Sequence, residues 1–136
     1  MSAGPGRAAG TPLVHHELCF GCGRTNLFGL LLEVQESGPD EVAGRCFIKQ
    51  DHQGADRGEA HPGVVGTALA EAMELACGLQ ARVVSFEIWF RAGAPVGAFL
   101  EVQARVERRD GSIAYAAATA LADQRMVAQA RGSFRL

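Results

Sequence analysis

The sequence lacks the features that are typical of nucleic-acid-binding proteins, membrane proteins and repeat proteins. Its 136 residues carry 13 Lys and Arg against 15 Asp and Glu, so no basic excess favours a nucleic-acid partner. No apolar run approaches the roughly 20 residues that a membrane span needs, and no internal repeat is present. We therefore expect one globular domain that binds neither nucleic acid nor a membrane.

The first residues are equally notable for what they do not contain. They are small and rich in Gly and Pro, and they lack the apolar segment of a signal peptide. We expect residues 1–14 to be a flexible leader and residues 15–136 to form the domain. Because no export signal is visible, we expect a cytoplasmic location.

Cysteine is also scarce, with only Cys19, Cys22, Cys46 and Cys77. Disulfides are not expected in a chain without an export signal. Cys46 and Cys77 lie in apolar surroundings, so we expect them to pack as small hydrophobic side chains.

The segment "HHELCFGC" brings His15, His16, Cys19 and Cys22 within eight residues. A CxxC motif with a nearby histidine can bind zinc, but a strong zinc signal requires a second spaced pair of ligands. Cys46 or a partner chain would have to supply that pair. A redox CxxC opens a helix after a strand, and that context is missing. We therefore expect no metal.

The hydrophobic pattern predicts one long helix and five to six strands. The helix is expected to begin at Pro62, which suits a first turn, and to end at Gly78. A long polar loop at residues 49–60 precedes it, and loops of that length are often functional. The segments with strand patterns are residues 30–37, 41–48, 81–90, 98–108, 113–122 and 126–136.

The predicted helix has two different faces. One carries the apolar residues Val65, Leu69, Ala72, Met73 and Ala76. The other carries Thr67, Glu71, Glu74 and Gly78. Because one helix cannot cover both faces of such a sheet, we expect an α+β fold in which an antiparallel sheet curls around the helix. A second copy would cover what remains, which predicts a homodimer or homotetramer.

Three segments, in this order, resemble one known family. They are "CFGCGRTNLFGLLLEV" at residues 19–34, "DHQG" at 51–54 and "RAGAPVG" at 91–97. The chain from residue 15 to 136 resembles the hotdog-fold acyl-CoA thioesterase superfamily, and especially its phenylacetate-degradation and 4-hydroxybenzoyl-CoA thioesterase branch. The resemblance implies a hotdog fold and hydrolysis of an acyl thioester, on coenzyme A or an acyl-carrier protein. It implies no cofactor beyond the coenzyme A of the substrate.

The resemblance also implies an active site at the start of the helix, at a dimer interface. The family's motif there is His-Gly-Gly, with an Asp or Glu eight residues after the first Gly. If His61 is the motif histidine, the donor position is Pro62, which has no N–H, and the acid position is Ala70. If Gly63 is the donor, Glu71 is the acid at the required spacing. We favour the second register because it keeps the donor and the carboxylate together.

In that register, the chemistry follows from the start of a helix. Unpaired N–H groups and the positive end of the helix dipole suit a developing oxyanion at Gly63. We expect burial to raise the pKa of Glu71, so that it acts as a general base or as a nucleophile. The structural alternatives are a helix-start glycine at Gly63 and a solvated surface carboxylate at Glu71, as we expect for Glu74.

Four further residues are candidates for the substrate pocket, and each has a plain structural alternative. His61 shapes the pocket or caps the helix, and Thr67 contacts Glu71 or bonds to a helix carbonyl. His52 lines the acyl pocket or is a surface histidine. Ser85 supplies a hydroxyl across the dimer, as in some family members, or is an ordinary strand serine.

Two arginines are candidates for binding coenzyme A phosphates. They are Arg91, beside the Pro-Gly bend, and Arg82, although most surface arginines have no such role. Asp56 and Glu59 are reserve carboxylates if Glu71 is not the base. The leading alternative function is a non-catalytic acyl-CoA or acyl-carrier binding module. A hydratase or dehydratase is less favoured because the required Asp/His spacing is not found.

Overall fold

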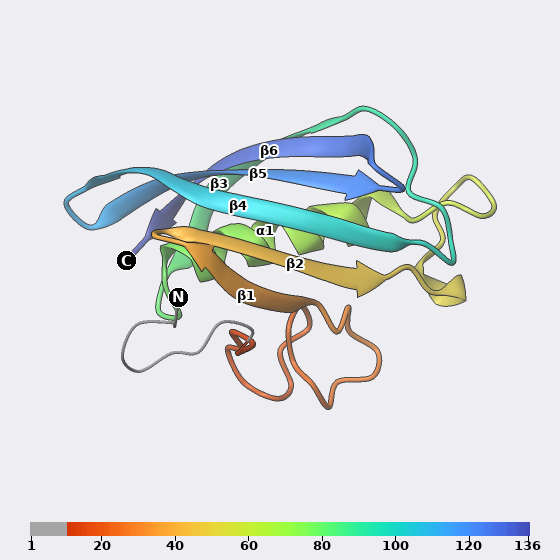
Figure 1. Ribbon diagram of the computed structural model, residues 1–136, viewed down its shortest axis with the longest axis horizontal. Coiled ribbons are helices and arrows are strands. Elements are labelled where there is room, and N and C mark those ends of the chain that lie inside the picture. Colours follow the sequence, from red (N-terminus) through yellow and green to blue (C-terminus); the bar gives the residue numbers. More distant parts are fainter. Residues whose placement is uncertain (1–10) are drawn as a thin grey trace.

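The computed structural model describes residues 11–136 (Figure 1). The elements are β1 (Glu33–Gly38), β2 (Glu41–Phe47), the 3-10 helix η1 (Gln50–His52), α1 (Pro62–Cys77), β3 (Arg82–Phe90), β4 (Phe99–Asp110), β5 (Ile113–Ala122) and β6 (Arg125–Arg135). Each predicted strand and the predicted helix are confirmed. The first strand starts later than expected, because Leu31 has a φ of 53° and interrupts the extended backbone.

The strands form a six-stranded antiparallel sheet in the order β1-β2-β4-β5-β6-β3. Tight hairpin turns join β4 to β5 and β5 to β6. In the second turn, Asp123 and Gln124 both have positive φ, at 49° and 66°, which matches the twist of the flanking strands. The sheet order makes β3 an edge strand, although it directly follows the helix in the chain.

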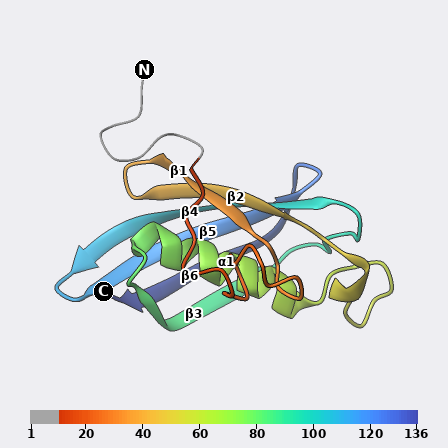
Figure 2. The ribbon, with the colours of Figure 1, turned by 90° about the horizontal axis from the view of Figure 1, so that it is seen from below.

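The sheet curls around α1, as the sequence predicts (Figure 2). Every second residue of β5 faces the helix, and each of these residues is a buried alanine. Their small side chains let α1 pack close to the sheet. These alanines are Ala114, Ala116, Ala118, Ala120 and Ala122. The apolar face of α1 packs there, and Leu69 and Met73 are fully buried. This packing sets the position of the helix relative to every strand.

The second face of α1 is covered by the segment before β1, residues 13–32, which we call the N-terminal segment (Figure 2). Leu13 is buried and its N–H bonds to the Val34 carbonyl at 2.7 Å. Cys22 and Leu32 are fully buried as well. Packing therefore begins before residue 15, so the expected leader is too long at its C-terminal end. The rest of that prediction, residues 1–10, lies outside the described residues.

Three smaller expectations can be checked in the same structure. Cys46 and Cys77 are buried in the core, as predicted. The polar loop is ordered by η1 and by a bridge between Gln53 and Ala60. Within residues 11–136, no helix combines the length and the apolar character that crossing a membrane requires.

Candidate functional site

The start of α1 is capped by its own chain. His61 is the N-cap residue, Pro62 occupies the first turn, and the Gly63 N–H donates to His61 Nδ1 at 2.8 Å. The Val64 N–H bonds to the His61 carbonyl at 2.9 Å. The donor that the sequence assigns to a substrate carbonyl is thus held by the imidazole of His61. A carbonyl could reach it only if that exposed ring moved aside.

An open cavity of about 470 Å³ lies between α1 and the edge strand β3. Its walls are Pro62, Gly63, Gly66, Thr67, Ala70, Glu71, Glu74, Phe86, Ile88 and Phe90. The cavity therefore brings together three predicted site residues, Gly63, Thr67 and Glu71. The Thr67 hydroxyl, however, donates to the Gly63 carbonyl at 2.8 Å, which is the structural alternative considered for it.

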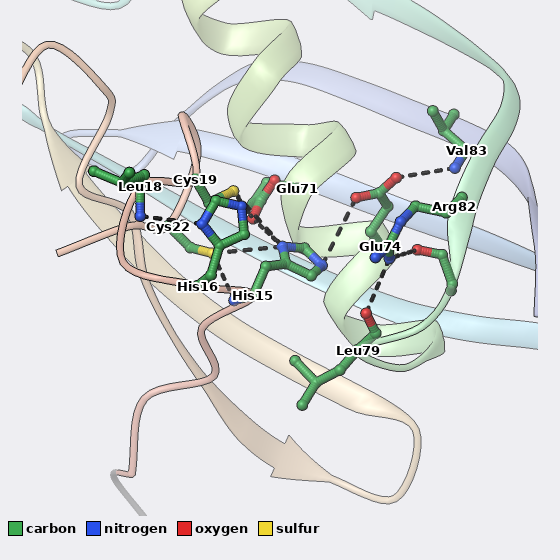
Figure 3. Close-up of polar contacts among 11 residues, drawn as sticks. His15, His16, Leu18, Cys19, Cys22, Glu71, Glu74, Leu79, Arg82 and Val83 are labelled. Carbon is green, nitrogen blue, oxygen red and sulfur yellow. Dashed lines mark hydrogen bonds and ion pairs between the residues drawn. The ribbon is translucent and has the colours of Figure 1, made fainter. Parts of the chain in front are cut away.

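Glu71 is held from the other side by the N-terminal segment (Figure 3). Its Oε2 accepts hydrogen bonds from His15 Nδ1 at 2.8 Å and from Cys19 Sγ at 3.4 Å. Gly21 lies against the carboxylate so closely that a Cβ there would be 2.5 Å from Glu71 Cδ. The glutamate is only 9% exposed. It is neither a solvated surface residue nor a freely moving side chain.

The pKa of Glu71 is lowered, whereas we expected it to be raised. Burial by itself would raise its pKa, but hydrogen bonds from His15 and Cys22, and the charge of His15, outweigh burial and lower it. The hydrogen bond to Glu71 raises the pKa of His15 to about 9. At neutral pH the two therefore form an ion pair of carboxylate and imidazolium. The predicted raised pKa of Glu71 is wrong, because the sequence did not reveal His15 as its partner.

His15, Cys19, Cys22 and Glu71 form one cluster, which we call the His-Cys-Glu cluster. Its four donor atoms all lie within 4.8 Å of one another. Cys22 is fully buried, and burial raises the pKa of its thiol well above the usual range. The sequence suggested Cys46 or a partner chain as the source of the missing metal ligands. The fourth group is instead a helix carboxylate 56 residues from His15.

Glu74 is also less exposed than expected. Its side chain is 16% accessible, and its Oε2 accepts the Val83 N–H at 2.9 Å. It thereby ties the last turn of α1 to the start of β3. Its other oxygen lies 3.8 Å from His15 Nε2 (Figure 3). The expectation of a solvated Glu74 is wrong because β3 turns back over this end of the helix.

Solved structures with the same architecture are numerous. The PaaI protein of the *E. coli* phenylacetic acid degradation operon matches with a TM-score of 0.72 at 17% identity, over 78% of this chain and 79% of that one. A variant of PaaI from *Thermus thermophilus* matches at 0.70 and 24% identity, over 77% and 93%. Zebrafish thioesterase superfamily member 2 matches at 0.71 and 19%, over 85% and 88%.

The chain has the hotdog fold of thioesterase superfamily proteins. No protein-family model matches the sequence, and no curated protein matches it. At these identities the likeness concerns the fold. The hotdog fold, expected from the order of the predicted elements together with three short segments, is confirmed.

Two of the candidate pocket residues, His52 and Ser85, lie away from the cavity between α1 and β3. His52 is buried in η1, where its Nδ1 accepts the Lys49 N–H at 3.0 Å, and it does not line the cavity. Burial, and then the charge of Lys49, lowers the pKa of His52. Ser85 Oγ pairs with Ser133 Oγ at 2.8 Å, and Ser85 lines a hollow that α1 does not border.

The two candidate phosphate ligands lie at opposite ends of β3, where Arg82 is the first residue of the strand and Arg91 follows the last. Arg82 donates to the carbonyls of Leu79 and Ala81, and Arg91 donates to the Gln129 side chain at 2.8 Å. A strand rises about 3.3 Å per residue, so roughly 30 Å separates the two positions. They cannot bind one phosphate group within a single chain.

Proposed function

We propose that this hotdog protein hydrolyses an acyl thioester carried by coenzyme A or an acyl-carrier protein. One observation carries the proposal: a buried carboxylate, Glu71, and the first-turn glycine of the helix, Gly63, line the same cavity. Three apolar side chains of β3, Phe86, Ile88 and Phe90, form the opposite wall and suit an acyl chain. The names of the structural neighbours support the reaction class.

The reaction would use the two oxygens of Glu71 differently. Oε2 is held by hydrogen bonds from His15 and Cys19, and we assign the proton transfer to Oε1. As water attacks the thioester carbon, Oε1 would take its proton; the C–S bond then breaks and the proton passes to the leaving thiolate. Direct attack by Oε1 on the carbonyl is the alternative first step.

The lowered pKa of Glu71 has a consequence for this mechanism. The carboxylate is already ionised at neutral pH, but it is a weaker base than the sequence led us to expect. Positioning and stabilisation of the oxyanion would therefore carry more of the rate enhancement. The Gly63 N–H would supply that stabilisation once the substrate displaces the His61 ring.

A second copy would complete the cavity. Strand β3 is a sheet edge of nine residues, and its exposed side chains include Val84, Trp89 and Phe90 at 56%, 44% and 49%. A long, apolar, unpaired edge is a surface on which another strand pairs. We propose at least a homodimer formed through β3. All four cysteines are free, which suits a reducing cytoplasm.

The test is a panel of acyl-CoA thioesters, with release of free thiol as the readout. Wild-type protein should turn over at least one of them. Glu71→Gln should lower kcat by about 10²-fold or more, since it removes the proton acceptor. The matched control is Glu101→Gln, an exposed position on β4, which should retain activity.

Two other outcomes would replace the proposal. Wild-type protein that binds acyl-CoA without turnover would be a binding module. Addition of water to an enoyl-CoA, without thiol release, would indicate a hydratase. Full activity in Glu71→Gln would show that the carboxylate is not the base.

A further inference from the structure

We propose that the His-Cys-Glu cluster is a tetrahedral site for a divalent cation of the zinc type. Its ligands would be His15 Nδ1, Cys19 Sγ, Cys22 Sγ and Glu71 Oε2. The inference does not rest on the proposed function, because binding of the cation can be measured without any substrate.

The distances between the donor atoms fit such a site. A tetrahedral zinc ion with bonds of about 2.3 Å to sulfur and about 2.0 Å to nitrogen or oxygen sets sulfur about 3.5 Å from either of them. Observed separations are 3.7 Å from Cys19 to His15, 3.5 Å from Cys22 to His15 and 3.4 Å from Cys19 to Glu71. Of these four separations, the 2.8 Å between His15 and Glu71 departs most from the expected value, roughly 3.3 Å, because the two atoms share a direct hydrogen bond; the two remaining pairs lie within 4.8 Å.

The backbone around the two cysteines is built to hold this arrangement. The Gly23 N–H closes a tight turn on the Cys19 carbonyl at 2.8 Å, and the His15 N–H donates to Cys22 Sγ at 3.2 Å. A side chain at Gly23 would place its Cβ 2.5 Å from backbone atoms of Cys19 and Glu17, so the turn requires glycine. The ligands therefore come from a fixed loop that rests on a rigid helix.

The chemistry of the donors selects the cation. Two thiolates and an imidazole favour zinc over magnesium or calcium, which prefer oxygen ligands. Two thiolates and one carboxylate contribute three negative charges, and a divalent cation leaves a net charge of −1. Binding displaces the protons of the two thiols and of the imidazole, with no change of oxidation state.

The buried setting also indicates a ligand. Cys22 is fully buried, and among residues 11–136 the two thiols make only contacts of 3.2–3.7 Å with His15 and Glu71. A bound cation would replace these weak contacts with four strong bonds. It would fasten the N-terminal segment to α1 as a closed site through Glu71 Oε2.

The experiment is a titration with Co²⁺, which reports thiolate ligands by a charge-transfer band in the near ultraviolet. Full-length protein, reduced and freed of metal with a chelator, should bind one Co²⁺ per chain and lose the band when Zn²⁺ is added. Cys19→Ser and Cys22→Ser should weaken binding by about 100-fold or more, since loss of a ligand costs at least as much as loss of a supporting contact. His15→Gln should do the same.

Matched controls make the titration specific. His16→Gln changes the adjacent, exposed histidine, and Cys46→Ser changes a buried cysteine outside the cluster. Both should bind Co²⁺ as the wild type does. If a ligand variant fails to fold, the wild type alone still tests the site, because Zn²⁺ should raise its Tm further as the free Zn²⁺ concentration rises above Kd.

Three results would overturn the site. They are no charge-transfer band in reduced wild-type protein, an unchanged band in both cysteine variants, or a Tm that Zn²⁺ leaves unchanged. A protein without thioesterase activity that shows the band would retain the metal site and lose only the proposed function.

Discussion

Replacement of Gly21 by alanine tests whether the N-terminal segment holds Glu71 in place. The new Cβ would lie 2.5 Å from Glu71 Cδ and 2.6 Å from Oε1. Ordinary contact begins at about 3.5 Å, so the carboxylate must retreat by about 1 Å. The backbone of Gly21 does not have a positive φ, so the effect is steric.

The magnitude follows from what that retreat breaks. A shift of this size stretches the 2.8 Å hydrogen bond between His15 and Glu71 beyond the hydrogen-bonding range. A hydrogen bond to a charged group contributes about 1.5–3 kcal/mol, and overpacking costs about 1–3 kcal/mol. The lost hydrogen bond and the overpacking result from the same displacement of Glu71, so their free-energy costs do not add. We expect Gly21→Ala to lower the free energy of unfolding by about 2–3 kcal/mol.

The assay is urea unfolding, followed by thioester turnover and Co²⁺ binding on the same samples. Gly111→Ala is the control, because Gly111 has a φ of 63° in a hairpin turn, with open space around its missing side chain. It should lose about 1–2 kcal/mol through backbone strain alone. Gly21→Ala should lose stability together with Co²⁺ binding and turnover, whereas Gly111→Ala should lose stability only. Wild-type stability in Gly21→Ala would refute the reasoning.

Two further predictions concern residues outside the cavity. Burial lowers the pKa of His52 below 6.5, so the unfolded chain binds a proton there that the folded chain rejects, and stability falls as pH drops below about 6.5. The free energy of unfolding of wild type should therefore exceed that of His52→Gln by less at about pH 5.5 than at about pH 7.5, as measured by urea unfolding. A difference that does not change with pH would contradict this. Gly78 ends α1 with a φ of 138° and a ψ of 157°, a backbone conformation that essentially only glycine adopts, so Gly78→Ala should cost about 1–3 kcal/mol in the same assay without weakening Co²⁺ binding.

Much of the fold was predictable because its elements have strong local signals. Strand β4 alternates apolar and polar residues. Helix α1 begins at Pro62, a residue that favours the first turn, and ends just before Gly78, a residue that favours the end of a helix. The order of these elements then left few ways to cover the helix. The start of β1 was missed by a few residues because a positive φ at Leu31 has no sequence signature.

The site was less predictable because it depends on contacts between distant segments. The spacing of Gly63 and Glu71 correctly brought both to one cavity. The capping of the helix by His61 was considered as the alternative for that residue, but its bond to the Gly63 N–H and the contact of His15 with Glu71 could not be inferred from spacing. One signal in the sequence pointed to the contact between His15 and Glu71. The CxxC segment lacked enough ligands for a metal, and a carboxylate on the polar face of the helix could have been considered as a further ligand.

The position of β3 in the sheet has a consequence for synthesis on the ribosome. Strand β3 forms one wall of the cavity, yet within residues 11–136 its only strand partner is β6, which is made after the other strands of the sheet. His15 likewise is made long before its partner Glu71. A nascent chain therefore carries an uncovered helix and an unpaired apolar strand until β6 has emerged. Shielding of that strand during translation would matter more for yield than the stability of the finished domain.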